Sequence, residues 1–324
     1  VIPNIYFQRR RDQLLNGLSV HGPVCEQKVM PIHSHGMGLI GQRPCPIGFF
    51  QHRDVFLHQF IRSSICFCGL SFENAFALPG IWYESISDQP SAYHNYEESR
   101  STVIEVIDFK KAYGDTLAVT GLSFRVEPGQ VWGLVGHNGA GKTTTMRVIS
   151  GLLSASSGTL RVNGFDVTEE PMEAKRRLAY LPDDPQLFET LTVGEHIEFF
   201  ASAYRLQDFE SEANDLLDYF ELSSKVDTAA EDLSRGMRQK LAICCGYLPH
   251  PSAILFDEPF TGLDPLAIRR LKSSIRDRAE QGAAIIVSSH LLAMVEDLCT
   301  HFLMLSQGQP TFCGTRQHLL EKHG

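Results

Sequence analysis

The chain has 324 residues, of which 43% are hydrophobic and 21% are charged, and its formal net charge is −9. That length is enough for about two domains, and the composition is that of an ordinary globular protein. The acidic balance excludes a protein that binds nucleic acid through bulk positive charge, because such domains are normally basic.

Residues 1–100 carry no sustained period of either a helix or a strand. They hold eight of the 29 basic and eight of the 38 acidic residues, so the excess of negative charge lies entirely in residues 101–324. The pairs His33 with His35 and Cys66 with Cys68 lack the spacing of a metal site. We expect residues 1–100 to be a disordered or non-native extension and residues 101–324 to be the functional domain.

The cysteines and the apolar runs indicate the cellular compartment of the chain and whether it spans a membrane. The eight cysteines form no regular framework, and no secretory signal with a charged start and an apolar core opens the chain. Both observations favour a reduced, cytoplasmic setting. No apolar run approaches the roughly 18 residues of a membrane-spanning helix. We therefore expect any work at a membrane to require a partner chain.

Regular patterns begin near residue 101. Residues 103–109 and 121–126 predict two strands, separated by a turn at 113–115. A Pro-Gly turn then leads into residues 131–135, an apolar run that predicts a buried strand.

Residues 136–143 fit the phosphate-loop pattern G-x-x-x-x-G-K-[ST] without a mismatch. The predicted strand precedes them, and residues 144–153 predict a helix after them, which is the context in which this pattern binds phosphate. The glycines let successive backbone N–H groups point at a phosphate, and the helix adds its positive N-terminal end. Lys142 is then predicted to reach the β and γ phosphates, and the Thr143 hydroxyl to bind Mg²⁺. The predicted nucleotide-binding residues of this loop are Gly136, His137, Asn138, Gly139, Ala140, Gly141, Lys142, Thr143 and Thr144.

Strand and helix patterns alternate beyond this helix. Residues 159–162 predict a strand, and Asn163-Gly164 after them is a strong hairpin signal. Residues 171–177 predict a helix and residues 178–181 a short strand.

Residues 192–245 predict helices throughout. Thr192 and Glu195 have the spacing of a capping box, and apolar residues recur behind them at helical spacing. We expect these helices to form a subdomain of about residues 184–246 that is inserted into the nucleotide-binding core.

Two continuous apolar runs follow, at residues 253–256 and 283–287. Both predict strands that are covered on both faces, each followed by a helix. The alternation of strands and helices predicts an α/β fold with a mostly parallel sheet. Residues 301–305, a turn and a final helix to about residue 322 complete the domain.

An acidic pair, Asp257 and Glu258, ends the first of these strands. The carboxyl ends of parallel strands are where α/β sheets place their sites, so we expect both carboxylates to face the phosphate loop. Asp257 is predicted to hold Mg²⁺, and Glu258 to orient and polarise an attacking water. His290 ends the next strand, where an imidazole suits a hydrogen bond to the transferring group. The predicted catalytic residues are Lys142, Glu258 and His290.

The order of these motifs resembles the nucleotide-binding domain of the ATP-binding cassette (ABC) family. Residues 233–237 resemble the family's L-S-G-G-Q signature, with Arg235 in place of the first Gly and Met237 in place of the Gln. The resemblance covers about two thirds of the chain, from residue 101 onward. It implies a P-loop NTPase core with an antiparallel β subdomain and the inserted helical subdomain.

The resemblance also assigns roles to single residues. Tyr113 is similar to the aromatic residue that stacks on adenine, and Asp264 lies in the loop that communicates across a dimer. Asp183 stands where the family has a Gln that contacts Mg²⁺, and Gln186 is a second candidate for that role. A carboxylate oxygen is a suitable ligand for a hard cation. The metal-binding residues implied are Thr143, Asp257 and Asp183.

The family binds ATP between the phosphate loop of one subunit and the signature of another. The resemblance thus implies that Ser234 and Gly236 serve a second copy of the chain, in a head-to-tail homodimer. It implies an ATP hydrolase that uses ATP and Mg²⁺ and drives a separate integral membrane permease, most like bacterial ABC-2 type export subunits. Such a subunit works at the cytoplasmic face of the plasma (inner) membrane and has no nucleic-acid partner. The alternatives are a non-transport ABC ATPase that acts on the ribosome or DNA, and a non-catalytic module that dimerises on ATP.

Overall fold

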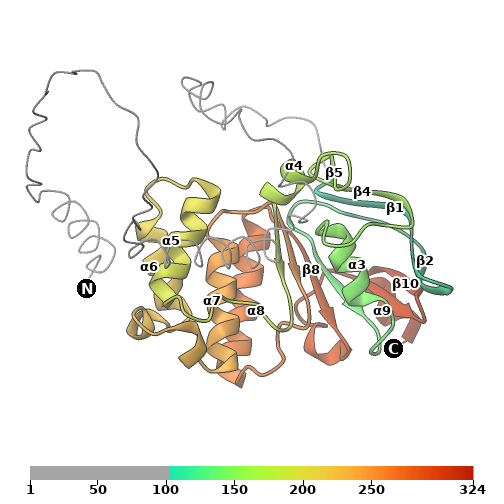
Figure 1. Ribbon diagram of the computed structural model, residues 1–324. Helices are drawn as coiled ribbons and strands as arrows, with labels where there is room; N and C mark the ends of the chain where they lie inside the picture. Colours follow the sequence, from blue (N-terminus) through green and yellow to red (C-terminus); the bar gives the residue numbers. More distant parts are fainter. Residues whose placement is uncertain (1–101, 324) are drawn as a thin grey trace, which may run out of the picture. The chain divides into compact units, whose positions relative to one another are not determined.

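Figure 1 shows the computed structural model of the chain, which describes residues 102–323. The described strands form two sheets, one of six strands and one of four. The expectations for residues 1–100, an extension without metal sites, lie outside the described residues.

The six-stranded sheet carries the continuous apolar runs of the sequence. Its strands are β3 (Val131–Val135), β6 (Leu178–Leu181), β7 (Ala253–Phe256), β8 (Ala284–Ser289), β9 (His301–Ser306) and β10 (Gln309–Thr315). Their order is β10-β9-β3-β8-β7-β6, and all neighbours pair in parallel except β10 with β9. Every residue of β3, β7 and β8 is buried, as expected for strands that are covered on both faces. The predicted mostly parallel α/β sheet is confirmed.

The four-stranded sheet is antiparallel and contains the predicted hairpin. Its strands are β1 (Ile104–Tyr113), β2 (Thr116–Val126), β4 (Ser157–Val162) and β5 (Phe165–Asp166), in the order β2-β1-β4-β5. Asn163 and Gly164 join β4 to β5 with φ angles of 53° and 82°. Positive φ at both central residues is what a type I′ turn requires, and Asn-Gly tolerates it well. The predicted hairpin and antiparallel subdomain are both present.

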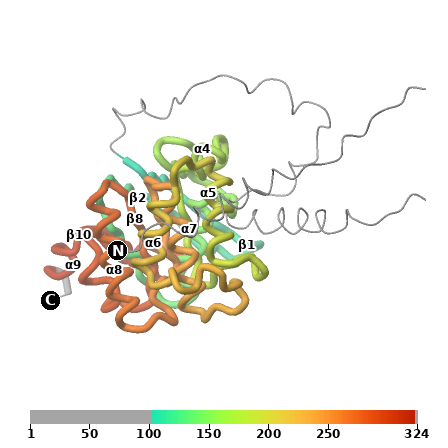
Figure 2. Tube along the Cα trace, turned by 90° about the vertical axis from the view of Figure 1, so that its left-hand side faces the viewer, coloured from blue at the N-terminus to red at the C-terminus, as the bar shows by residue number. Residues whose placement is uncertain are grey.

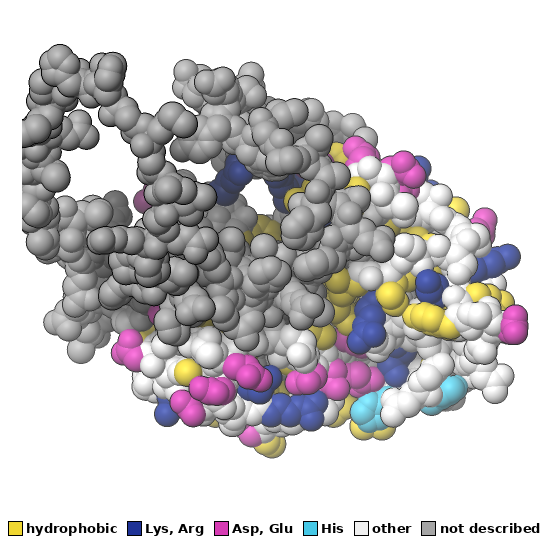
Figure 3. Space-filling model, in the orientation of Figure 1, with side chains coloured by type: hydrophobic (Ala, Val, Ile, Leu, Met, Phe, Trp, Pro, Cys, Tyr) yellow, Lys and Arg dark blue, Asp and Glu magenta, His cyan; other side chains and the backbone are white. Residues whose placement is uncertain are grey.

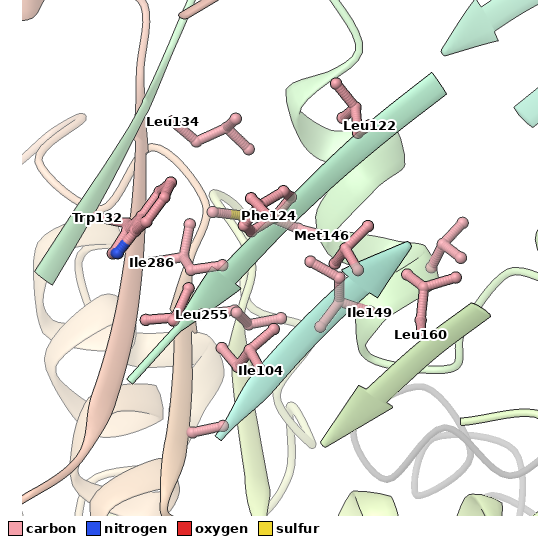
Figure 4. Close-up of a cluster of buried hydrophobic side chains, with 14 of the residues drawn as sticks. Ile104, Leu122, Phe124, Trp132, Leu134, Met146, Ile149, Leu160, Leu255 and Ile286 are labelled. Carbon is pink, nitrogen blue, oxygen red and sulfur yellow. The ribbon is translucent and has the colours of Figure 1, made fainter. Parts of the chain in front are cut away.

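Helix α3 (Lys142–Ile149) connects the cores of the two sheets. It contacts β2 and β4, and its Met146 and Ile149 are almost fully buried. Figure 4 shows these side chains in one cluster with Phe124 of the antiparallel sheet and Ile286 of the parallel sheet. One continuous core therefore fixes the segment before α3, which is the phosphate loop, relative to both sheets.

The predicted helical subdomain contains α5 (Val193–Tyr204), α6 (Glu210–Tyr219) and α7 (Arg235–Tyr247). The Thr192 hydroxyl accepts a hydrogen bond from the Glu195 N–H, and the Glu195 carboxylate accepts one from the Thr192 N–H. The predicted capping box is thus confirmed. Both α5 and α6 contact α7, and Figures 1 and 2 show the three helices gathered together, away from β10.

The remaining α-helices of the described chain are α4 (Pro171–Arg176), α8 (Pro265–Glu280) and α9 (Arg316–His323). Between residues 102 and 323, no helix has both the length and the apolar character needed to cross a bilayer.

Two helix predictions need correction. The helix predicted over 144–153 spans Lys142–Ile149, because Gly151 turns the chain with a φ of 66°. The helix predicted after residues 283–287 is wrong, since β8 leads only into a 3₁₀ turn, Leu292–Met294. The eleven residues between β8 and β9 must pass to the other side of β3, which lies between these strands. That crossing leaves no room for a long helix.

Candidate functional site

The phosphate loop, residues 136–143, joins β3 to α3 at the carboxyl end of the parallel sheet. Gly139 and Gly141 have φ angles of 81° and 102°, in the region that favours glycine. A Cβ at Gly136 would collide with the carbonyl oxygen of Leu305, so only glycine fits there. The loop is therefore held on the tight path that the motif predicts and leads directly into the N-terminus of α3.

The Lys142 ammonium lies against this loop. Its Nζ donates hydrogen bonds to the carbonyl oxygens of Gly136 at 2.6 Å and His137 at 3.3 Å. It also lies 3.3 Å from Glu258 Oε1, and the lysine side chain is only 5% exposed. Lys142 thus joins the phosphate loop to the acidic end of β7. Thr143 and Thr144 follow it in the first turn of α3.

Asp257 follows β7 and is almost fully buried, at 3% exposure. Its Oδ1 accepts a hydrogen bond from Ser288 Oγ at 2.7 Å, and its Oδ2 accepts one from the Tyr180 hydroxyl at 3.2 Å. Burial, together with the charge of Asp257, raises the pKa of Tyr180, so this hydroxyl stays protonated and donates. Both carboxylate oxygens are therefore fixed by neighbouring strands, β6 on one side and β8 on the other.

Glu258 connects the predicted catalytic residues. Its Oε2 accepts a hydrogen bond from His290 Nδ1 at 2.9 Å, while its Oε1 faces Lys142. The Glu258 backbone has a φ of 49°, and its N–H donates to Ser288 Oγ at 2.8 Å. Non-glycine residues seldom adopt positive φ, and such strain often marks functional positions. The structure thus brings Lys142, Glu258 and His290 into one chain of contacts.

Tyr180, Ser288 and Arg147 belong to this site and were not predicted from the sequence. Ser288 touches both acidic residues, and a hydrogen bond with Tyr180 raises the pKa of Arg147. The register of the sheet places Tyr180 and Ser288 there, because β6 and β8 both flank β7. Arg147 comes from helix α3. A sequence signal exists only for Ser288, which lies two residues before His290 at the end of an apolar strand. Only the order of the strands, which places β8 beside β7, shows that Ser288 reaches the acidic pair.

Replacing Ser288 with Ala should reduce the rate of hydrolysis about tenfold or more, because Asp257 and Glu258 both lose the hydroxyl that positions them. Steady-state phosphate release measures this effect. Ser274→Ala is a matched control, since Ser274 is also a buried serine, hydrogen-bonded to Tyr247 rather than to the site. Both variants should lose about 1–3 kcal/mol of unfolding free energy. Equal rates for the two variants would contradict the positioning role of Ser288.

The signature residues lie on the start of α7. The Ser234 side chain caps this helix by accepting from the Met237 N–H at 3.3 Å. A Cβ at Gly236 would lie 3.4 Å from the Gly262 carbonyl oxygen. Among the hydrogen bonds and ion pairs of residues 102–323, none joins Ser234 or Gly236 to the phosphate loop. No such contact therefore holds the two predicted halves of the nucleotide site together within one copy.

Two further predicted residues make no hydrogen bond or ion pair with Lys142, Glu258 or His290 in the described part of the chain. Asp264 Oδ1 caps α8 by accepting from the Ala267 and Leu266 N–H groups, both at 2.9 Å, and these bonds lower the pKa of Asp264. Tyr113 ends β1 with 49% of its surface exposed, and the Lys111 ammonium lies 5.1 Å from its ring centroid. An exposed ring of this kind offers a stacking surface.

Asp183 follows β6 and lies close to the acidic residues of the site. Burial raises its pKa, the charges of Asp257 and Glu258 add to the rise, and Arg235 opposes it. Arg235 Nη2 lies 3.0 Å from Asp183 Oδ1. The other candidate, Gln186, donates back to Asp184 in its own loop. Asp183 is therefore the candidate whose charge acts on the site.

The chemistry of this donor set fits Mg²⁺. Within residues 102–323, no cluster of three or more His, Cys, Asp or Glu side chains forms a complete metal site. Mg²⁺ is usually held by one or two carboxylates, with water and substrate phosphates completing its shell. Asp257, Asp183 and the Thr143 hydroxyl at the edge of the phosphate loop provide that kind of partial set.

Comparison with known sequences gives consistent matches. The model of the ABC transporter family matches residues 119–261. The chain is 36% identical over 225 residues to the ABC-type transporter ATP-binding protein EcsA of Bacillus subtilis. This match covers 69% of this chain and 91% of EcsA. It is 32% identical to the linearmycin resistance ATP-binding protein LnrL of the same organism, over 68% of this chain and 72% of LnrL. It is 31% identical to the Nod factor export ATP-binding protein I of Cupriavidus metallidurans, over 68% of this chain and 74% of that protein.

Solved structures show the same fold. The ATP-binding subunit of an ABC transporter superposes with a TM-score of 0.66 at 35% identity, covering 68% of this chain and 93% of the other. A nucleotide-free ATP-binding cassette from an ABC transporter superposes with a TM-score of 0.59 at 23% identity. The superposition covers 68% of this chain and 94% of the other. The predicted P-loop NTPase fold is confirmed.

Proposed function

Because this chain belongs to the family of ABC transporter ATP-binding subunits, we propose that it works as a pair of copies that drives a separate integral membrane permease, in the direction of export. The chain binds and hydrolyses ATP, as members of this family do. In the proposal, two equivalent sites form between two copies related by a two-fold axis.

One observation supports the pairing above all others. Lys142, Glu258 and His290 are joined by direct contacts, whereas Ser234 and Gly236 have no hydrogen bond to the phosphate loop within the described chain. Within a single copy, therefore, direct contacts join the catalytic residues to the phosphate loop but do not join the signature to it. A second copy with the opposite orientation would supply the signature to each phosphate loop.

Glu258 is the proposed general base. Held between His290 and Lys142, its carboxylate would orient a water molecule and take a proton from it as that water attacks the γ-phosphate. Lys142 would stabilise the negative charge on the phosphates. Asp257, Asp183 and Thr143 would hold Mg²⁺, which neutralises further phosphate charge when it is bound.

The transport role is supported by what the similar proteins are called. They include an ABC-type transporter ATP-binding protein and a Nod factor export ATP-binding protein. From this similarity we infer that the chain works at the cytoplasmic face of the plasma (inner) membrane, bound to a permease.

The alternative of an ATPase that acts on the ribosome or DNA receives no support from the face shown in Figure 3. There the basic side chains of the described residues are interspersed with acidic ones and form no continuous positive band. Recognition of nucleic acid normally needs such a band.

Affinity purification from native membranes in a mild detergent tests the partner. We expect one integral membrane protein with several spanning helices to co-purify with the tagged chain, and ATP hydrolysis to change when that protein is present. Co-purification with ribosomes or DNA instead, without any membrane protein, would contradict the proposal.

A further inference from the structure

Two residues that depart from the family pattern are in contact with each other. Asp183 lies in the loop after β6, and Arg235 is the first residue of α7, 52 positions further along the chain. Arg235 Nη2 donates to Asp183 Oδ1 at 3.0 Å. The pair joins the loop near the proposed metal site to the signature segment.

The stem of Arg235 is also placed by a third loop. A Cβ at Gly262, in the segment between β7 and α8, would lie 3.3 Å from Arg235 Cδ and 3.5 Å from its Nε. Gly262 has a φ of 77°, so glycine is favoured there on backbone grounds as well. The Arg235 side chain thus passes over Gly262, which has no side chain to obstruct it, and its guanidinium reaches Asp183.

This ion pair is well suited to exchange and poorly suited to stabilise the fold. The two side chains are 53% and 46% exposed, and exposed pairs contribute little to stability. Asp183, however, experiences the negative charges of Asp257 and Glu258, because it follows a strand that pairs directly with β7. The carboxylates of Asp257 and Glu258 thus make the position of Asp183 attractive to any cation. In the described structure the Arg235 guanidinium is the cation bound to Asp183.

We propose that Arg235 is a positioning residue that holds Asp183 as a counter-ion and releases it when a divalent cation binds beside Asp257. This rests on the proposed function, since it concerns the same metal site. Arg235 and the metal compete for one carboxylate, so metal binding and the contact between Asp183 and Arg235 are thermodynamically linked. A cation bound in one copy therefore frees the Arg235 side chain, which lies in the segment that is proposed to face the second copy.

The test measures metal affinity directly and does not depend on turnover. Free Mn²⁺ is titrated by electron paramagnetic resonance against the full chain with a non-hydrolysable ATP analogue. Arg235→Gln should tighten Mn²⁺ binding about two- to fivefold, as expected for removal of an exposed competing charge. Asp183→Asn should weaken Mn²⁺ binding. In the Asp183→Asn background, Arg235→Gln should have no further effect.

Arg238→Gln is the matched control, because it removes the same charge three residues along the same helix, where no contact with Asp183 exists in the described chain. It should leave Mn²⁺ affinity unchanged. The inference is overturned if Arg235→Gln has no effect, or if it tightens Mn²⁺ equally with and without Asp183. Failure of the proposed permease partner would appear in the purification experiment, and failure of the proposed pairing would appear when inactive variants are mixed; neither result would change these titrations.

Discussion

Replacing Glu258 with Gln should lower ATP hydrolysis by about two to four orders of magnitude while leaving ATP binding in place. Gln preserves the size of the side chain and a polar contact with His290, but it cannot take a proton from water. Lys142 and the phosphate loop remain intact, so the affinity for ATP should change little. Steady-state phosphate release gives the rate, and calorimetric titration with a non-hydrolysable analogue gives the affinity.

Glu280→Gln serves as the matched control for this variant. Glu280 is an exposed residue at the C-terminal end of α8, about 20 Å along the helix axis from the end nearest the site. The same charge change there should leave the rate at the wild-type level. A Glu258→Gln variant that hydrolysed ATP at a rate close to that of the wild type would remove Glu258 from the role of general base.

Replacing Lys142 with Ala should abolish hydrolysis and weaken ATP binding at least tenfold. The phosphate site loses its charged donor, and a charge-assisted bond is about twice as strong as a neutral one. Glu258 also loses its neighbouring cation, so the carboxylate is less well placed. Equilibrium binding of a fluorescent ATP analogue measures the first effect.

Lys225→Ala is the control for the loss of a lysine, since Lys225 is exposed in a 3₁₀ turn of the helical subdomain. Its ATP affinity should equal that of the wild type. If Lys142→Ala bound ATP as tightly as this control does, the phosphate loop would not be the principal nucleotide contact.

The elements that the sequence predicts well depend on local signals. The hairpin at Asn163 and Gly164 follows from their tolerance of positive φ, and the capping box at Thr192 from two residues one turn apart. The buried strands β3, β6 and β7 match their predicted bounds because uninterrupted apolar runs are short and sharply ended.

The elements that the sequence does not predict depend on pairing. Strand β10 has mostly exposed or partly exposed residues and exists because it pairs with β9 at the sheet edge. The segment after β8 contains apolar residues at Val295 and Leu298 that suggest a helix, yet the crossing past β3 dictates its path. No local sequence pattern shows that β3 lies between β8 and β9.

In the candidate site, too, the residues marked by local sequence signals were predicted and those that depend on strand pairing were not. The phosphate loop, Asp257, Glu258 and His290 were predicted because each stands at the end of a recognisable strand. Tyr180 and the ion pair of Asp183 with Arg235 were not, because they depend on which strands are neighbours and on contacts across 52 or more residues.

Mixing two inactive variants tests the central claim, that each site is shared between two copies. Lys142→Ala lacks a working phosphate loop, and Gly236→Asp places a negative charge in the signature. A Cβ at residue 236 would be in ordinary contact distance, 3.4 Å from Gly262 O, so the second variant should fold. In a mixed pair, one site combines the intact loop of one copy with the intact signature of the other. We expect each variant alone to be inactive and an equal mixture to recover about a quarter of the wild-type rate, as random pairing of two-fold dimers gives. A mixture no more active than the two variants measured separately would contradict the shared site.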